Sequence, residues 1–220
     1  MINLLLNGEY LLFSLLILVL ALSLSCHEFG HALVAKWCGD TTAERQGRLT
    51  LNPIAHLDVM GMLMVILVGF GYAKPVPTDP RNFRHRSSEL WIAAAGPLMN
   101  GLLALVTWNL YVLAYQAGWQ DPGMQLFFGI LASVNLLLMI FNLIPIGPLD
   151  GHYILPYFLP RPLARFYRTY KHRYGTLILL GLIIAIVAGL PIQGALAEFN
   201  QTLLRLITLC LLYTSDAADE

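Results

Sequence analysis

Residues 8–37 read GEYLLFSLLILVLALSLSCHEFGHALVAKW, an apolar run that carries His27, Glu28 and His31 near its C-terminal end. As one helix, this run would be about 45 Å long, which exceeds the roughly 30 Å thickness of the hydrocarbon core of a bilayer. Ionisable side chains inside a membrane helix are energetically expensive and usually mark function. The run therefore predicts a membrane-spanning helix with a chemical site inside it.

The composition of the 220-residue chain also indicates a membrane protein. Hydrophobic residues make up 57% of the chain and charged residues 12%, whereas soluble domains carry about 25% charged residues. The formal net charge is +0, and no basic face is available for nucleic-acid binding. We expect an all-α, multi-pass protein embedded in the lipid bilayer.

Positive charges predict how the chain crosses the membrane. Further apolar segments lie at 57–73, 89–117, 124–146, 174–191 and 194–212. Lysine and arginine residues both precede and follow 57–73. Because cytoplasmic loops are rich in these residues, a span there would put one group on the wrong side. We therefore predict about five transmembrane helices, a short re-entrant or β-hairpin segment at 57–73, and an extracytoplasmic N-terminus.

A single domain is expected over residues 1–209, with a core at 8–160 and a C-terminal helical pair at 174–209. Residues 210–220, CLLYTSDAADE, resemble the translation of a sequencing adapter. We interpret them as a non-native tail, and a genuine acidic C-terminus is the alternative.

The sequence HEFGH at 27–31 has the spacing of a metal site. Histidines at positions i and i+4 share one face of a helix, so His27 and His31 can bind one zinc ion. Glu28 is then placed to accept a proton from water and to pass it to a leaving amine. Two packed histidines beside a buried glutamate are the alternative.

Two histidines leave a catalytic zinc site one protein ligand short. Asp150 follows the 124–146 span, and the expected topology returns it to the level of the histidines. Asp58 and Asp79 lie in or near the re-entrant region and Asp121 on the opposite side of the membrane. Asp150 is therefore the first candidate, with His152 as the rival ligand and a helix-capping role for Asp150 as the structural alternative.

HEFGH in one membrane helix and NLIPIGPLDG (142–151) at the end of another resemble motifs of the site-2 protease family of intramembrane zinc metallopeptidases. The segments LNPIAHLD (51–58), GYAKPVP (71–77) and AGPLMN (95–100) are similar to segments of its compact bacterial and archaeal members. The resemblance implies one Zn²⁺ per chain, held by His27, His31 and Asp150, with Glu28 as the catalytic acid and base.

The same resemblance implies that Asn142 faces the active site, where it would help to hold the substrate or the oxyanion. It also implies that 57–73 is the membrane-embedded β-hairpin region of the family. No PDZ insertion and no CBS domains are expected in this chain.

Lys74 and Asn100 are candidate substrate-binding residues. The sequence Lys74-Pro-Val-Pro77 is typical of an edge strand, because proline cannot donate a hydrogen bond within a central strand. Such an edge can align an unfolded substrate by strand addition. For Asn100, which lies within a span, support of the site or an interhelical hydrogen bond are the alternatives.

The expected function is hydrolysis of peptide bonds in or near the transmembrane segments of single-span membrane proteins. The expected location is a prokaryotic cell membrane, with the active site toward the cytoplasm. A metal-ion or proton transporter that uses intramembrane histidine and aspartate residues is the alternative function, and an inactive scaffold that binds transmembrane partners is a third. Against transport, the sequence has no internal repeat of the kind that transporters often show.

Overall fold

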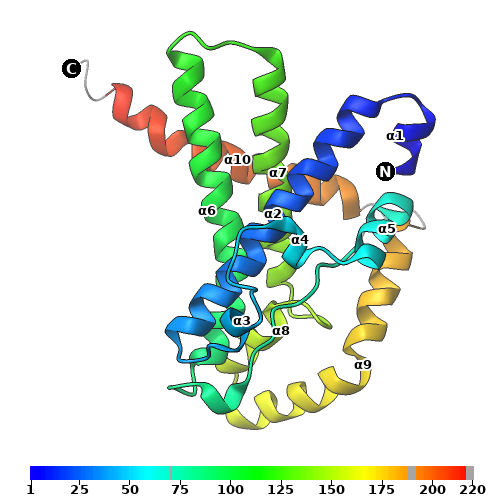
Figure 1. Ribbon diagram of the computed structural model, residues 1–220, viewed down its shortest axis with the longest axis vertical. Helices are drawn as coiled ribbons and strands as arrows, with labels where there is room; N and C mark the ends of the chain where they lie inside the picture. Colours follow the sequence, from blue (N-terminus) through cyan, green and yellow to red (C-terminus); the bar gives the residue numbers. More distant parts are fainter. Residues whose placement is uncertain (70, 188–191, 217–220) are drawn as a thin grey trace.

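The computed structural model describes residues 1–69, 71–187 and 192–216, and within these residues it is built from helices without a β-sheet. Three of the described helices are long and apolar enough to cross a membrane: α2 (Tyr10–Trp37), α6 (Ser88–Gln116) and α7 (Pro122–Leu143). Helices α6 and α7 stand side by side, and α2 packs across both of them (Figure 1). The prediction of an all-α polytopic membrane protein is confirmed.

A short connection at 117–121 joins α6 to α7 at one end of the molecule (Figure 1). Helix α7 begins with Pro122, and the side chain of Asp121 accepts a hydrogen bond from the N–H of Met124 at 2.9 Å. Proline in the first turn and a capping aspartate are both favourable at a helix N-terminus. The sequence therefore ends one long helix and starts the next within a few residues.

Helices α2 and α6 approach each other closely at two glycines. A Cβ atom on Gly30 would lie 2.9 Å from the carbonyl oxygen of Ala95, and a Cβ atom on Gly96 would lie 2.6 Å from Nε2 of His27. Small residues at helix crossings are typical of membrane proteins, because association there depends on close packing. This crossing brings the backbone of α6 against the histidines of α2.

Residues 38–87, between α2 and α6, form short elements that extend from the end opposite the 117–121 connection to about the middle of the molecule (Figure 1). These elements are α3 (Thr42–Arg45), α4 (Pro53–His56), α5 (Val59–Val68) and the 3₁₀ helix η1 (Pro80–Asn82). We call residues 73–79 the returning segment, because they carry the chain from α5 back to η1. Within the described residues the returning segment is extended and holds one isolated antiparallel bridge, between Leu57 and Ala73.

The excursion predicted at 57–73 is present, but it is built on helix α5 and not on a β-hairpin. Asp58 caps α5 by accepting a hydrogen bond from the N–H of Gly61 at 2.9 Å. The sequence VMGMLMVILV is apolar throughout, and a helix satisfies the backbone of such a stretch internally where water is absent. The bridge between Leu57 and Ala73 then closes the excursion at its base.

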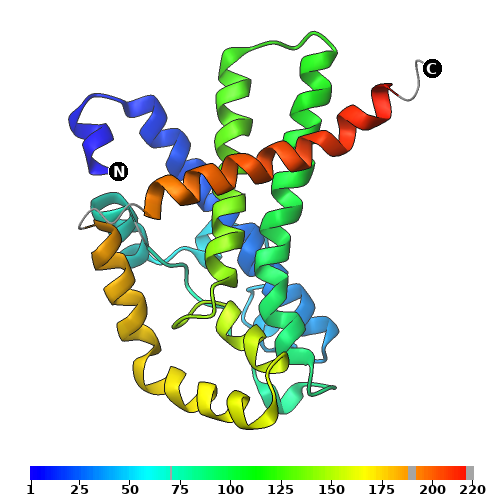
Figure 2. The ribbon, with the colours of Figure 1, turned by 180° about the vertical axis from the view of Figure 1, so that it is seen from behind.

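The chain after α7 continues through α8 (Gly151–Ile154), the 3₁₀ helix η2 (Leu155–Tyr157), α9 (Arg161–Val187) and α10 (Ile192–Asp216), and a short helix α1 (Ile2–Leu6) precedes α2. Helix α9 begins across the α8 end of the molecule and then turns toward α5, while α10 crosses α6 and α7 obliquely (Figure 2). Trp108 of α6 donates a hydrogen bond to Thr208 of α10 at 2.5 Å.

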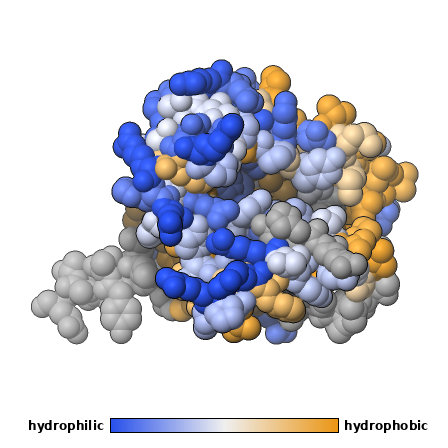
Figure 3. Space-filling model, turned by 90° about the horizontal axis from the view of Figure 1, so that it is seen from below, coloured by the Kyte–Doolittle hydropathy of each residue, from blue (hydrophilic) through white to orange (hydrophobic). Residues whose placement is uncertain are grey.

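The predicted spans at 174–191 and 194–212 fall within α9 and α10, except that residues 188–191 lie outside the described residues. Residues 217–220 of the suspected tail also lie outside them. The domain boundary at 209 and the non-native origin of the tail stay predictions. At the α8 end of the molecule, hydrophilic side chains cover much of the surface (Figure 3).

Candidate metal centre

Three side chains from two distant parts of the chain meet between α2 and the start of α8. His27 and His31 lie one turn apart on α2, with their Nε2 atoms 3.1 Å apart. Asp150 follows the end of α7, and its Oδ2 atom is 3.2 Å from Nε2 of His27 and 3.4 Å from Nε2 of His31. Within the described residues, His27, His31 and Asp150 form a group of three potential metal ligands. Their ligand atoms all lie within 4.8 Å of one another.

The other ring nitrogens of the two histidines are held by hydrogen-bond acceptors. Nδ1 of His27 lies 2.6 Å from Oδ1 of Asn100, and Nδ1 of His31 lies 2.6 Å from the carbonyl oxygen of Ile92. An acceptor at this position fixes the proton of a neutral imidazole on Nδ1. The lone pairs of both Nε2 atoms are therefore directed toward Asp150.

This arrangement fits a zinc ion. Oδ2 of Asp150 is buried and has no hydrogen-bond donor among the described residues other than the facing histidines. Three atoms that offer lone pairs to one another repel unless a cation lies between them. Ligands about 2.0–2.2 Å from a tetrahedral zinc lie about 3.3–3.6 Å apart, close to the separations of 3.1, 3.2 and 3.4 Å found here. Two nitrogens and one carboxylate oxygen also leave a fourth position open, as in catalytic zinc sites.

Asn100 supports His27 from a buried network that links the three long helices. Its side chain is fully buried, and its Nδ2 donates to Oδ1 of Asn135 on α7 at 2.7 Å and to the carbonyl oxygen of Ser23 on α2 at 3.2 Å. Asn135 in turn donates to Oγ of Ser23 at 2.8 Å. Of the roles considered for Asn100, these contacts favour support of the site and interhelical bonding, and its predicted contact with substrate stays untested.

Glu28, the residue after His27 in α2, is buried. Its Oε2 atom accepts a hydrogen bond from the backbone N–H of Val76, in the returning segment, at 3.1 Å. The returning segment therefore lies against the carboxylate that the sequence predicts to be the catalytic acid and base.

Lys74, two residues before Val76, has an exposed side chain and a fixed backbone. Its N–H donates to the carbonyl oxygen of His56 at 2.8 Å, and its own carbonyl oxygen accepts from the guanidinium of Arg48. Arg48 and His56 are both buried. The role of Lys74 in substrate binding stays a prediction. The fold places Lys74 two residues before Val76, whose N–H donates to Glu28.

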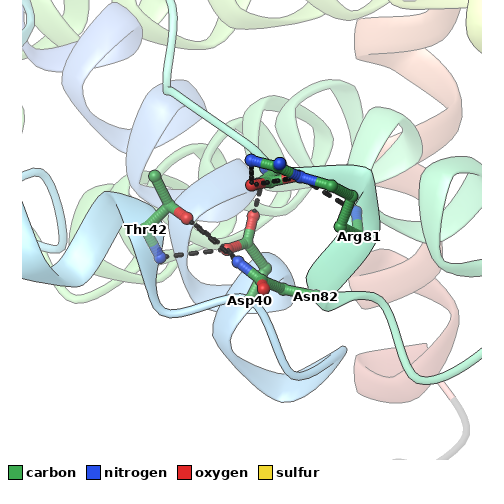
Figure 4. Close-up of polar contacts among 5 residues, drawn as sticks. Asp40, Thr42, Arg81 and Asn82 are labelled. Carbon is green, nitrogen blue, oxygen red and sulfur yellow. Dashed lines mark hydrogen bonds and ion pairs between the residues drawn. The ribbon is translucent and has the colours of Figure 1, made fainter.

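The far end of the returning segment is attached to Asp40, just after α2. Oδ2 of Asp40 accepts from the N–H of Asp79 at 2.7 Å, while its Oδ1 accepts from Thr42 Oγ1 at 2.5 Å and from Asn82 Nδ2 at 3.0 Å (Figure 4). Burial acts to raise the pKa of Asp40, but these hydrogen bonds, led by that of Thr42, outweigh it and hold the pKa below its ordinary value. Asp40 therefore acts as an ionised anchor for the loops.

Asn142, predicted to face the active site, lies near the end of α7 and is partly buried. Its Nδ2 donates to the carbonyl oxygen of Leu138, one turn earlier in the same helix, at 3.0 Å. Within the described residues, no hydrogen bond joins it to the three candidate ligands, so its catalytic role stays a prediction.

The rival ligands lie elsewhere. Asp58, Asp79 and Asp121 each cap the start of a helix by accepting a backbone N–H. His152, the rival ligand, is buried in α8, and its ring lies 3.7 Å from that of Tyr153, centre to centre. It is absent from the described group of three ligands. The side chain of Asp150 makes no capping hydrogen bond, which leaves it to face the histidines.

Several residues that shape the site could not be identified from the sequence. The acceptor for His31 is a backbone carbonyl, the donor to Glu28 is a backbone N–H, and Asn135 and Ser23 are isolated polar residues in apolar helices. Gly96 carried the clearest signal, because a glycine followed by proline within a span suggests a bent helix that approaches another backbone closely.

Comparison with known proteins shows the family to which the chain belongs. Residues 15–120 and 109–186 match Peptidase family M50. The chain is 36% identical over 199 residues to YwhC of Bacillus subtilis, a candidate zinc metalloprotease by its name, and the match covers 88% of this chain and 90% of YwhC. No solved structure matches the chain.

Two further relatives are similar over a shorter range. The chain is 33% identical over 147 residues to Rip2 of Mycolicibacterium smegmatis and 31% identical over 137 residues to Rip2 of Mycobacterium tuberculosis, which are also named as candidate zinc metalloproteases. These matches cover 62% and 59% of this chain, and 55% and 51% of the Rip2 proteins. The chain thus spans about half the length of the Rip2 proteins it matches. The family match and the relation to YwhC together show that this chain belongs to peptidase family M50, the site-2 protease family, and is an intramembrane zinc metallopeptidase.

Proposed function

We propose that His27, His31 and Asp150 hold the Zn²⁺ of this peptidase and that Glu28 transfers protons during hydrolysis. The observation that carries the proposal is the meeting of three lone-pair donors from α2 and the α7–α8 junction at separations of 3.1 to 3.4 Å. The substrates that we propose are single-span membrane proteins, cleaved within or next to their transmembrane segments.

Zinc, when bound, supplies a Lewis acid that polarises the scissile carbonyl and makes water a better nucleophile. Glu28 follows His27 directly in α2, and its carboxylate is held by the N–H of Val76. It accepts a proton as water attacks the carbonyl carbon and donates a proton to the nitrogen of the departing amine. In this scheme Asn100 orients His27, because an acceptor at Nδ1 sets both the tautomer and the plane of the ring.

Asn142 and the returning segment are the proposed substrate contacts. A transmembrane helix hides its carbonyl groups in its own hydrogen bonds, so a substrate must unwind before hydrolysis. An unwound segment needs new partners for its backbone at membrane depth. The carbonyl groups of residues 75–78, which accept no hydrogen bond among the described residues, can provide some of them by strand addition, and the amide of Asn142 can hold the carbonyl oxygen.

The active site is proposed to open toward the cytoplasm. Positive residues lie on this side of the molecule: Lys36 near the C-terminal end of α2, Arg45 in α3 and Arg81 in η1. The 117–121 connection, at the opposite end of the molecule, contains no lysine or arginine. This asymmetry agrees with the enrichment of positive residues in cytoplasmic loops. Water would reach Glu28 from the same side.

Glu28→Gln tests the proposed function. This substitution keeps the size of the side chain and removes the base, so purified protein should retain its zinc, while cleavage of tagged single-span membrane proteins falls by about 100- to 10,000-fold. His85→Gln, at an exposed loop position, is the matched control and should cleave as the wild type does. Cleavage by Glu28→Gln at the wild-type rate would contradict the role of Glu28, and zinc transport that survives the substitution would favour a transporter.

A further inference from the structure

The sequence Lys74-Pro75-Val76-Pro77 contains one backbone N–H between its two prolines, and that N–H is directed at the active site. Proline has no N–H to donate, so Val76 supplies the sole donor in the stretch 75–77. It donates to Oε2 of Glu28 at 3.1 Å, across 48 residues of sequence. The function proposed above does not use this contact.

The returning segment is fixed on the α5 side of Val76. Both backbone groups of Lys74 are bound, the N–H to His56 and the carbonyl oxygen to Arg48. His56 is held in its turn, because its Nε2 lies 2.7 Å from the carbonyl oxygen of Thr50 and its Nδ1 lies 3.4 Å from Nη2 of Arg48. Since Arg48 and His56 are buried, this attachment does not depend on an exposed side chain.

The segment is also fixed on the η1 side. The N–H of Asp79 donates to Asp40 at 2.7 Å, and the N–H of Asp40 donates to the carbonyl oxygen of Ala35, in the last turns of α2, at 2.9 Å. Glu28 belongs to the same helix. The protein itself therefore fixes the position of the Val76 N–H relative to the carboxylate of Glu28, without any substrate.

A hydrogen bond to one oxygen of a catalytic carboxylate restricts its rotation and leaves the other oxygen to exchange protons. Among the described residues, Oε2 of Glu28 is bound by Val76, and no protein donor is found for Oε1. Hydrogen bonds to charged groups are stronger than those between neutral groups. We propose that Val76 is a positioning residue of the peptidase, whose backbone N–H orients the carboxylate of Glu28 for proton transfer. This proposal rests on the proposed role of Glu28 as acid and base.

Two substitutions at Val76 separate its N–H from its side chain. Val76→Ala keeps the N–H and shortens the side chain, whereas Val76→Pro keeps apolar bulk and removes the N–H. In the full-length protein, we expect kcat for a tagged single-span reporter to fall about 10- to 100-fold in Val76→Pro. KM and zinc content should change little, and Val76→Ala should retain much more of the wild-type kcat than Val76→Pro. Equal losses in both variants would overturn the proposal, and so would faster cleavage by Val76→Pro, which would indicate that the segment blocks the site.

A backbone ester keeps the test decisive if Val76→Pro fails to fold. Replacing Val76 by its α-hydroxy acid deletes the N–H and changes little else. The same replacement at Asp121, in the connection at the opposite end of the molecule, is the control, because that residue is exposed and its N–H has no partner among the described residues. A fall in kcat at position 76 but not at position 121 is the expected result. Wild-type kcat at position 76 would overturn the proposal, while loss of cleavage in Glu28→Gln would still support the proposed function.

Hydrogen exchange provides a readout without substrate. The amide of Val76 should exchange at least about 10-fold faster in Glu28→Ala than in the wild type, because its acceptor is gone. Unchanged exchange would contradict the hydrogen bond itself, whatever the peptidase activity of the protein.

Discussion

The two sides of the metal centre are held in different ways. On the helical side, His27 and His31 are supported from within the packed helices α2, α6 and α7, by the carbonyl group of Ile92 and by the network of Asn100. On the loop side, Glu28 is supported by the extended returning segment, which is attached at its ends to Arg48 and Asp40. The difference indicates that the metal ligands depend on helix packing, while the proton-transfer group depends on loop anchors.

Gly96→Ala should produce the largest effect, because it disturbs the helical side directly. The new Cβ atom would lie 2.6 Å from Cε1 and Nε2 of His27 and closer still to His31. Zinc affinity should fall by more than about 100-fold, since the ligands themselves are displaced and not only their supports. Zinc per purified chain, measured by mass spectrometry, gives the answer.

Gly101→Ala is the matched control in the same helix. Its Cβ atom would meet the sulfur of Met139 at 2.7 Å, and a flexible methionine can move aside. Full zinc in Gly96→Ala, or equal loss in both variants, would show that the close approach of α6 to the histidines is not needed.

Asn100→Ala should have the next largest effect, because it removes the acceptor at Nδ1 of His27 without touching a ligand. Loss of such a supporting group typically weakens metal binding by about 10- to 100-fold. Competition with a chelator measures the zinc affinity. Asn109→Ala is the control in the same helix, because the amide of Asn109 donates to the carbonyl oxygen of Leu105 in its own helix. This variant should keep the zinc affinity of the wild type. An equal loss of zinc affinity in Asn109→Ala and Asn100→Ala would contradict the role of Asn100 in supporting His27.

Asp40→Ala should have the smallest effect, and on the loop side alone. It removes an ionised acceptor of several hydrogen bonds, so the free energy of unfolding should fall by about 2 kcal/mol at neutral pH with zinc still bound. The folded-state pKa of Asp40 lies below its ordinary value, so its stabilisation is complete above about pH 4 and is lost as the pH falls toward the folded pKa. The difference in Tm between wild type and variant should therefore shrink on acidification.

Glu44→Ala is the control for Asp40→Ala. Glu44 forms an exposed ion pair with Lys36 at 2.6 Å, and exposed pairs contribute little stability. If Asp40→Ala and Glu44→Ala had the same small effect at every pH, Asp40 would not anchor the loops.

The sequence predicts the helical side of the site better than the loop side. The spacing of His27 and His31 is a local signal within one helix. The distribution of positive charge predicted a topology in which Asp150 lies at the same depth in the membrane as these histidines. The partners of these residues were not predictable, because a backbone carbonyl such as that of Ile92 has no signature in the sequence. Asn135 looks like any polar residue in an apolar helix until α6 and α7 are packed together.

The loop side depended on contacts that arise only in the folded chain. The return of the 57–73 segment was predicted from charge, but its conformation was not, because ten apolar residues fit a buried strand and a short helix equally well. The prolines around Val76 predicted an edge strand, but within the described residues the segment forms no strand and has one isolated bridge, at Ala73. The hydrogen bond from the N–H of Val76 to Glu28 could not be predicted, because it depends on how Arg48 and Asp40 hold the segment. Arg48 and Asp40 are both distant from Val76 in the sequence.

Zinc content of the Asp150→Ala variant tests the central claim most directly, because Asp150 joins the two halves of the metal centre. We predict that purified Asp150→Ala loses its zinc and that His152→Ala, two residues further along the chain in a buried position, keeps one zinc per chain. Full zinc in Asp150→Ala, or loss of zinc in His152→Ala, would contradict the claim that His27, His31 and Asp150 hold the metal.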